Sequence, residues 1–145
     1  MLSPKDLKMR DKALEKNLIE RVAMGDLLRR RSRDSAGKTA LVDFPKGVRR
    51  ETTYGELNNR VNQLAYGLIS KGLKQGDKLS LISTNQRDMV VVYFACYKLG
   101  VIVVPINFMQ NIDDIRYNFE HSESVAIVYE DLFTDIVLSL CSNSD

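Results

Sequence analysis

The chain has 145 residues, and its 21 lysines and arginines against 19 aspartates and glutamates give a net charge of +2. A chain of this length buries roughly 70% of its unfolded surface, which is enough for one domain with a real core. The hydrophobic share of 44% and the charged share of 28% exclude collagen-like, low-complexity and disordered classes. The small net charge gives no support for nucleic acid as a partner.

Cysteine usage and the N-terminus indicate the compartment. Only Cys96 and Cys141 are present, and the charged N-terminus lacks the apolar core of a signal peptide. A cytoplasmic protein is the economical interpretation. The longest apolar run, at 89–96, is far shorter than the ~20 residues that a membrane-spanning helix needs. We therefore expect no transmembrane segment.

The first third of the sequence predicts a helix and a hairpin. Residues 1–36 are polar and helix-prone, with a few loosely spaced apolar positions, among them Leu18 and Val22. A β-hairpin is predicted over 37–53, because the β-prone runs TALVDF (39–44) and VRRETT flank a Pro-Lys-Gly turn.

From Tyr54 the apolar residues follow a helical period and form one stripe. The stripe consists of Leu57, Val61, Leu64, Ala65 and Leu68. The stretch TYGEL at 53–57 opens this helix with capping-box spacing. The Thr53 hydroxyl can accept from the amide of Glu56, whose carboxylate reaches back to residue 53. Gly72 occupies the position expected of a C-terminal cap.

The remaining sequence alternates strands and helices. A partly alternating strand is predicted at 78–84, and a helix at 86–99 is apolar on nearly every side. Gly100 ends this helix. The run VIVVPIN at 101–107 lacks alternation, which is typical of a strand covered on both faces.

Asn111 is predicted to cap the next helix, with Asp113 and Asp114 in its first turn. A strand at 125–130 and a helix at 132–140 follow. Strands that alternate with helices over short connections indicate a parallel sheet with right-handed crossovers.

The fold class is therefore α/β: an N-terminal helix and a β-hairpin followed by a three-strand βαβαβα unit over 54–145. We expect 1–145 to be a single partial domain, because such sheets normally continue beyond three strands.

Two features could be taken for anion sites. The triplet GKT at 37–39 is the tail of a phosphate-binding loop, but the first glycine of that pattern would fall at Ser32, and the triplet precedes a strand instead of following one. A solvated loop is the better interpretation. The run Arg29, Arg30, Arg31 and Arg33 could bind phosphate, although cations at a helix C-terminus also complement its dipole.

The residue types that perform catalysis are sparse. His121 is the only histidine and lies near a helix end, so a cap-region role is expected. Cys96 lies within an apolar helix, where a thiol behaves as a small hydrophobe, and Cys141 has no partner base. The pair Asp113 and Asp114 is typical of a helix start. We expect no catalytic, cofactor-binding or metal-binding residue in this chain.

Four stretches in order carry a resemblance to a known family. TYGEL at 53–57 resembles the first core motif of the adenylate-forming (AMP-binding) enzymes, and YKLGVIVVPIN at 97–107 resembles their second. The segments at 72–85 and 113–131 are also similar to segments of that family. Order and spacing agree over roughly residues 17–135, and the fatty-acyl-CoA and related acyl-CoA synthetases are most alike.

The resemblance implies an enzyme that activates a carboxylic acid with ATP as an acyl-adenylate and transfers it to CoA. ATP, Mg²⁺ and CoA are the cofactors that it implies for a complete enzyme. The glycine-rich phosphate loop, the ribose-binding aspartate and the catalytic lysine of that family have no counterpart here. Developing charge in such a reaction needs preorganised donors and cations. We therefore expect no cofactor for this chain by itself.

Three hypotheses follow. In the first, the chain is an N-terminal fragment of an acyl-CoA ligase, inactive alone, and its partner is the remainder of that enzyme. In the second, it is a non-catalytic interaction protein that pairs with itself or with a full-length ligase through an open sheet edge. In the third, an acid or a nucleotide binds weakly at the C-terminal ends of the strands.

Overall fold

The structure is a computed structural model that describes residues 23–141, with the backbone alone for Cys141. Helix α2, Met24–Asp34, confirms the helical prediction for that part of the N-terminal segment. Leu18, Val22 and the other positions before residue 23 lie outside the described residues. A hairpin follows, made of β1 (Thr39–Asp43), a 3-10 turn η1 (Pro45–Gly47) and β2 (Arg50–Thr53).

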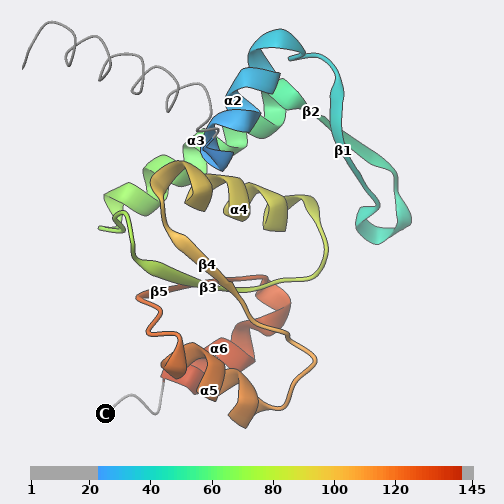
Figure 1. The fold of residues 1–145 in the computed structure, drawn as a ribbon. Coiled ribbons are helices and arrows are strands. Elements are labelled where there is room, and N and C mark those ends of the chain that lie inside the picture. Colours follow the sequence, from blue (N-terminus) through green and yellow to red (C-terminus); the bar gives the residue numbers. More distant parts are fainter. Residues whose placement is uncertain (1–22, 142–145) are drawn as a thin grey trace, which may run out of the picture.

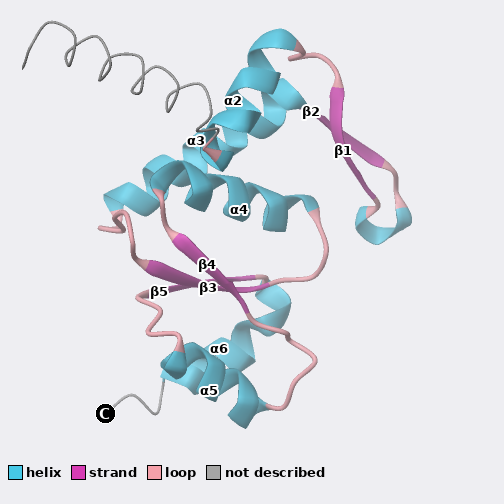
Figure 2. Cartoon of the chain, viewed as in Figure 1, coloured by secondary structure: helices cyan, strands magenta, loops and turns pink. Residues whose placement is uncertain are grey.

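After the hairpin the chain forms the predicted alternation of helices and strands (Figures 1 and 2). Its elements are α3 (Tyr54–Ser70), β3 (Lys78–Ile82), α4 (Arg87–Leu99), β4 (Ile102–Pro105), α5 (Ile112–His121), β5 (Ala126–Tyr129), a 3-10 turn η2 (Asp131–Phe133) and α6 (Thr134–Cys141). The strands pair in parallel in the order β4-β3-β5, which confirms the predicted fold class.

The helices cover the two faces of this sheet as separate layers (Figure 1). Helices α2, α3 and α4 share one apolar cluster with the face of β3 that carries Leu79 and Leu81. Helices α5 and α6 form a second cluster on the other face, around Ile82 and Ile115. The central strand is therefore buried between two cores, and Leu79 and Ile82 have no exposed surface.

The first turn of α3 satisfies its backbone donors within the chain. The Thr53 hydroxyl accepts from the Glu56 amide at 3.3 Å, and Glu56 Oε2 accepts from the Thr53 amide at 2.8 Å, so the predicted capping box is confirmed. The Tyr54 amide donates to the Lys38 carbonyl at 3.0 Å, and the Gly55 amide to the Ala36 carbonyl at 2.9 Å. The loop after α2 thus supplies acceptors that a helix start otherwise lacks.

The end of α3 forms a Schellman motif. The Gly72 amide donates to the Ile69 carbonyl at 2.9 Å, and the Leu73 amide to the Leu68 carbonyl at 3.1 Å. Gly72 has φ +92°, a conformation that other L-residues rarely adopt. Gly72 therefore ends the helix as predicted, one position beyond the capping residue Lys71.

Strand β4 departs from the prediction that both of its faces are covered. Val101 and Ile106 at its two ends are buried, but Ile102 keeps 50% of its surface exposed, and Val103 and Val104 are half-buried. The reason is its place in the sheet: of the three strands of this sheet only β3 has neighbours on both sides. An apolar run without alternation indicates a strand in a two-sided sheet and does not say whether it is central.

Helices α2 and α4 cross in direct backbone contact at Gly25. A Cβ atom placed on Gly25 would lie 2.8 Å from Lys98 Cα and 2.8 Å from the Tyr97 carbonyl oxygen. The α4 helix also joins α3 there, since Lys98 Nζ donates to Asn58 Oδ1 at 2.8 Å and to Asn62 Oδ1 at 2.6 Å. One glycine therefore sets how closely α2 approaches the rest of this layer.

Gly25→Ala is expected to destabilise the protein by about 1–3 kcal/mol, because the added methyl group forces α2 and α4 apart. Gly67→Ala is the matched control: Gly67 lies inside α3, and nothing lies within 4 Å of the position that its methyl group would take. There the better helix propensity of alanine should stabilise by about 0.5–1 kcal/mol. Urea unfolding of both variants measures the two changes, and a stabilising Gly25→Ala would contradict the close crossing.

The capping box predicts a pH dependence. Hydrogen bonds from the backbone amide and the hydroxyl of Thr53 hold the pKa of the Glu56 carboxyl below its ordinary 4.5. A lowered folded-state pKa contributes stability that is present above the unfolded value and is lost as the pH falls through the folded one. The wild type should therefore exceed Glu56→Gln in stability at neutral pH, and the gap should narrow below pH 4.5.

Unfolding free energies of the two proteins between neutral and acidic pH test this directly. Glu120→Gln is the control, because Glu120 is exposed and none of the side-chain hydrogen bonds found within residues 23–141 uses its carboxylate. A gap between wild type and Glu56→Gln that stays constant with pH would exclude the ionised capping box.

Candidate functional site

The carboxyl ends of β3 and β5 form the place where an open parallel sheet offers a ligand crevice. The chain leaves β3 toward α4 on one face and leaves β5 toward α6 on the opposite face (Figure 1). Neighbouring strands whose connections diverge in this way open a crevice beyond their carboxyl ends. Ser83 and Thr84 follow β3 there, and Glu130 follows β5.

The Glu130 carboxylate forms hydrogen bonds to the β3–α4 loop at this crevice. Its Oε2 atom accepts from the Thr84 backbone amide in a short contact and from Ser83 Oγ at 3.3 Å. Its Oε1 atom accepts from Thr84 Oγ1 at 3.1 Å. Both oxygens are therefore engaged by the protein itself, and the side chain ties the ends of two neighbouring strands together.

A hollow of about 430 Å³ lies beside this carboxylate, between the hairpin turn and the strand ends. Phe44 and Lys46 line it from the hairpin, and Asn85 and Gln86 line it from the start of α4. Lys46 is the one cation among the residues that line it, and Asp43 and Glu130 contribute carboxylates.

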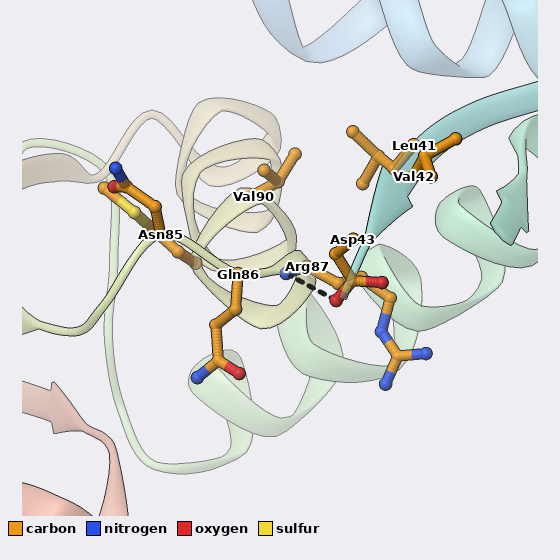
Figure 3. A pocket seen from close by; sticks show the side chains of 8 residues that line it. Leu41, Val42, Asp43, Asn85, Gln86, Arg87 and Val90 are labelled. Atoms are coloured by element: carbon orange, nitrogen blue, oxygen red, sulfur yellow. Dashed lines mark hydrogen bonds between the residues drawn. The ribbon is translucent and has the colours of Figure 1, made fainter. Parts of the chain in front are cut away.

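A second hollow, of about 300 Å³, lies between β1 and the first turn of α4 (Figure 3). Its floor is apolar, with Leu41 and Val42 from β1 and Met89 and Val90 from α4. Figure 3 shows Asp43 at its rim, directed toward the backbone amide of Arg87.

Asp43 connects the hairpin to the start of α4. Arg50 forms a two-pronged ion pair with it, with Nε 2.9 Å from Oδ1 and Nη2 in short contact with Oδ2. The Arg87 amide, at the first residue of α4, donates to Asp43 Oδ2 at 3.4 Å. The Arg50 hydrogen bonds are the main cause that lowers the pKa of Asp43. This carboxylate is therefore an ionised capping group with its partners in place.

The described residues offer no cluster of metal ligands for the Mg²⁺ that the resemblance implies. Residues 23–141 contain no group of three or more His, Cys, Asp or Glu side chains that could hold a metal ion. The carboxylates at the two hollows are engaged, Glu130 by Thr84 and Asp43 by Arg50. We therefore derive no step of an ATP-dependent or CoA-dependent reaction from this part of the chain.

The GKT triplet at 37–39 has a structural place. The Lys38 carbonyl accepts from the amide of Tyr54, and Thr39 Oγ1 donates to Glu51 Oε2 at 2.6 Å across the hairpin. The triplet enters β1, so its backbone cannot form the strand-to-helix loop that surrounds a phosphate.

The arginine run lies on the exposed side of α2. Arg29 pairs with Asp26 at 2.9 Å, and Arg31 and Arg33 lie in the last turn, where cations favour the helix dipole. Arg29 also borders a shallow hollow of about 360 Å³ with Lys98. Burial, followed by repulsion from Arg29, lowers the pKa of Lys98.

The other candidates are dispersed over the fold. The His121 ring stacks on Tyr117 at 5.2 Å in the last turn of α5, on the opposite side of the sheet from α2 (Figure 1). Cys96 is fully buried in α4, and burial raises the pKa of its thiol to about 11. The Cys141 side chain lies outside the described residues.

The predicted helix start at Asn111 is confirmed. Asn111 Oδ1 accepts from the amide of Asp114 at 2.9 Å, and Asp113 and Asp114 occupy the first turn of α5. These carboxylates therefore act at a helix N-terminus, as expected.

Glu130 and Asp43 are the two positions that the sequence did not single out. Asp43 is the last residue of β1, and Glu130 directly follows β5. A polar residue just after a parallel strand indicates a position at the ligand crevice of an open sheet. The sequence shows this pattern at Glu130, which directly follows the apolar run VAIVY at 125–129. Its partners Ser83 and Thr84 lie more than 40 residues earlier, so the pairing itself is invisible in the sequence.

Comparison with known proteins identifies the family. Residues 28–143 match the family model described as AMP-binding enzyme, which is most of the chain, and the chain belongs to this family. A medium/long-chain-fatty-acid–CoA/3-oxocholest-4-en-26-oate–CoA ligase of Mycolicibacterium smegmatis is 34% identical over 90 residues, 62% of this chain and 16% of that protein. A 3-oxocholest-4-en-26-oate–CoA ligase of Rhodococcus rhodochrous is 32% identical over 91 residues, again 16% of its length.

Solved structures match the same N-terminal region of acyl-CoA ligases. The N-terminal domain of FACL13 from Mycobacterium tuberculosis superposes with a TM-score of 0.79 at 25% identity, covering 86% of this chain and 31% of that one. A benzoate CoA ligase from Burkholderia xenovorans superposes with a TM-score of 0.77 at 25% identity, covering 86% of this chain and 24% of that one. The fold thus matches the N-terminal domain of acyl-CoA ligases, and the chain spans less than a fifth of the length of the two curated relatives described above.

None of the helices within residues 23–141 is both long enough and apolar enough to cross a membrane.

Glu130→Ala is expected to destabilise the protein by about 1–3 kcal/mol, because it leaves the Thr84 amide and the Thr84 hydroxyl without their acceptor. Glu130→Gln keeps one acceptor oxygen and should cost less. Denaturant unfolding measures both changes, with the exposed Glu120→Ala as the control. A loss no larger than that of the control would show that the carboxylate is not holding the strand ends together.

Proposed function

We propose that this chain serves as the structural first part of the N-terminal domain of an acyl-CoA ligase and has no catalytic activity by itself. A ligase of this kind activates a carboxylic acid with ATP and transfers the acyl group to CoA. In this proposal residues 23–141 position the sheet and the helix layers on which the reacting groups of the larger enzyme are built.

The observation that carries the proposal is that residues of the family motifs have structural roles. Thr53 and Glu56 of the TYGEL stretch bond to each other, and Gly55 donates to the Ala36 carbonyl. Gly100, in the second motif, ends α4 with φ +68°. Each of these four residues therefore has a structural role in the fold, and the carboxylates at the strand ends are engaged as well.

A fatty or other apolar carboxylic acid is the substrate class that we propose for the larger enzyme. The relatives include ligases named for medium- and long-chain fatty acids and for a steroid acid, and a structural neighbour is named for benzoate. What these names share is a carboxylate on an apolar body. In the proposal, ATP, Mg²⁺ and CoA are bound by residues beyond those described.

An independent interaction protein is the second candidate function. The specific observation in its favour is that β4 and β5 each have one side without a partner strand in the described part of the chain. The coding sequence after Asp145 separates the two candidates. An open frame that encodes the glycine-rich phosphate loop supports the ligase, and a stop codon supports the separate protein. A cytoplasmic location stays a prediction for either.

ATP–pyrophosphate exchange tests the proposed inactivity. With Mg²⁺ and a panel of short, medium and long fatty acids, the 145-residue chain should give no exchange above the rate without protein. The Mycolicibacterium smegmatis ligase is the positive control under the same conditions. Exchange by the chain alone would contradict the assignment of the chemistry to other residues, and Lys38 and His121 would be the first positions to substitute.

A further inference from the structure

Helices α2, α3 and α4 meet around the hollow of about 360 Å³ that Arg29 and Lys98 border (Figure 1). Gly25 lets α2 cross α4 in backbone contact. Arg29 lies four positions after Gly25 and therefore on the same face of α2. Asn62 of α3 lines the hollow as well. The close crossing thus brings the side chains of Arg29 and Lys98 to one place.

The Lys98 ammonium group has neutral hydrogen-bond partners. It donates to Asn58 Oδ1 at 2.8 Å and to Asn62 Oδ1 at 2.6 Å, both on α3. None of the ion pairs found within residues 23–141 includes Lys98. A lysine ammonium carries three N–H donors, so one is left for a further acceptor. Because a partly buried charge without an opposite charge is costly, a bound anion would stabilise this group.

Positive charge exceeds negative charge around this hollow. Among the described residues that line it, Arg29 and Lys98 are the cations and Asp26 is the carboxylate. Asp26 pairs with Arg29 at 2.9 Å, yet the Arg29 side chain stays 61% exposed, so its guanidinium group can take a second partner. Burial lowers the pKa of Lys98 most, and repulsion from Arg29 lowers this pKa by more than attraction to Asp26 raises it.

The helix dipole does not account for Arg29. The basic residues in the last turn of α2 are Arg31 and Arg33, and Arg29 lies earlier in the helix. The hollow is also separate from the strand-end crevice, since Arg87 begins α4 beside Asp43 and Lys98 lies in the last turn of α4. At about 1.5 Å of rise per residue, the two ends of this helix are roughly 16 Å apart.

We propose that this hollow binds a phosphate group between the Arg29 guanidinium of α2 and the Lys98 ammonium of α4. The planar fork of an arginine matches two phosphate oxygens, and a lysine binds phosphate as a point charge. Asn58 and Asn62 are positioning residues, because they hold the ammonium group by its other donors. The ligand is inorganic phosphate or a phosphate monoester. The proposal goes beyond the ligase function and does not depend on it.

Titration of the 145-residue chain with inorganic phosphate tests the site, with backbone amide chemical shifts as the readout. Sodium chloride at equal ionic strength is the reference, because salt screens any exposed charge. The amides of Gly25 and Lys98 should shift to saturation, and that of His121, on the opposite side of the sheet, should not. Ribose 5-phosphate is the second arm: tighter binding than that of inorganic phosphate identifies a monoester as the ligand, and equal or weaker binding identifies the free ion.

Arg29→Gln should weaken phosphate binding at least ~5-fold, because a charge-assisted hydrogen bond is lost. Arg31→Gln is the matched control: it removes the same charge from α2 at a position that does not line the hollow, and should change the affinity by less than ~2-fold. Asp26→Asn should act in the opposite direction and tighten binding, since it removes the carboxylate that competes for Arg29.

Lys98→Gln should also weaken binding at least ~5-fold, for the same reason as Arg29→Gln. This variant leaves an asparagine oxygen without its donor, so its melting temperature without phosphate is measured as well. If Lys98→Gln does not fold, the opposite effects expected for Arg29→Gln and Asp26→Asn decide the matter, because both side chains are largely exposed.

Three results would overturn the proposal. Equal weakening by Arg29→Gln and Arg31→Gln would mean that phosphate responds to the charge of α2 as a whole. Shifts that match those in sodium chloride, or that do not saturate, would mean that no site exists. Saturable shifts that leave Gly25 and Lys98 unchanged would place the anion elsewhere. Each of these results leaves the proposed ligase function untouched, which depends on the ATP–pyrophosphate exchange experiment.

Discussion

The first turn of α3 is the constraint on which the rest of the structure depends. A helix start leaves its first amides without intrahelical partners. Here their hydrogen-bond acceptors are the Thr53 hydroxyl and carbonyls of the loop that follows α2. That loop therefore cannot move without exposing helix donors. Because β2 runs directly into α3, the same turn fixes where the hairpin projects, and Asp43 then attaches the hairpin to α4.

Signals that act over a few residues could be predicted from the sequence. The capping box at Thr53 and Glu56, the cap at Asn111 and the glycine ends of α3 and α4 all depend on neighbours within five positions, and the structure confirms them. The alternation of elements also predicted the parallel sheet, since parallel strands need crossovers and helices supply them. The family resemblance rested on the same stretches and is confirmed by the match over residues 28–143.

Interactions between distant segments could not be predicted. The contact of Gly25 with α4 spans more than 70 positions, and nothing in a polar helix marks one glycine as a crossing point. The bond between Glu130 and Thr84 likewise depends on which strands become neighbours. The exposure of Ile102 has the same origin, because apolar composition does not reveal the order β4-β3-β5. The candidate site was less predictable than the fold for this reason.

Family motifs can identify an enzyme without performing its chemistry. In this chain the glycines and capping residues of the matched stretches hold the first turns and the helix ends, and its single histidine and its buried thiol lie apart from the strand-end crevice. The effect of these glycines and capping residues on a reaction would be exerted through folding.

A capping variant in an active enzyme tests that claim most directly. In a chimera in which this chain replaces the matched segment of the Mycobacterium tuberculosis fatty acyl CoA synthetase, 24% of that protein, Thr53→Ala with Glu56→Ala removes the capping box and leaves every group beyond this chain in place. We expect a lower melting temperature and an unchanged kcat per folded, titrated active site. A kcat that falls at an unchanged melting temperature would contradict the account, because it would make TYGEL part of the catalytic machinery.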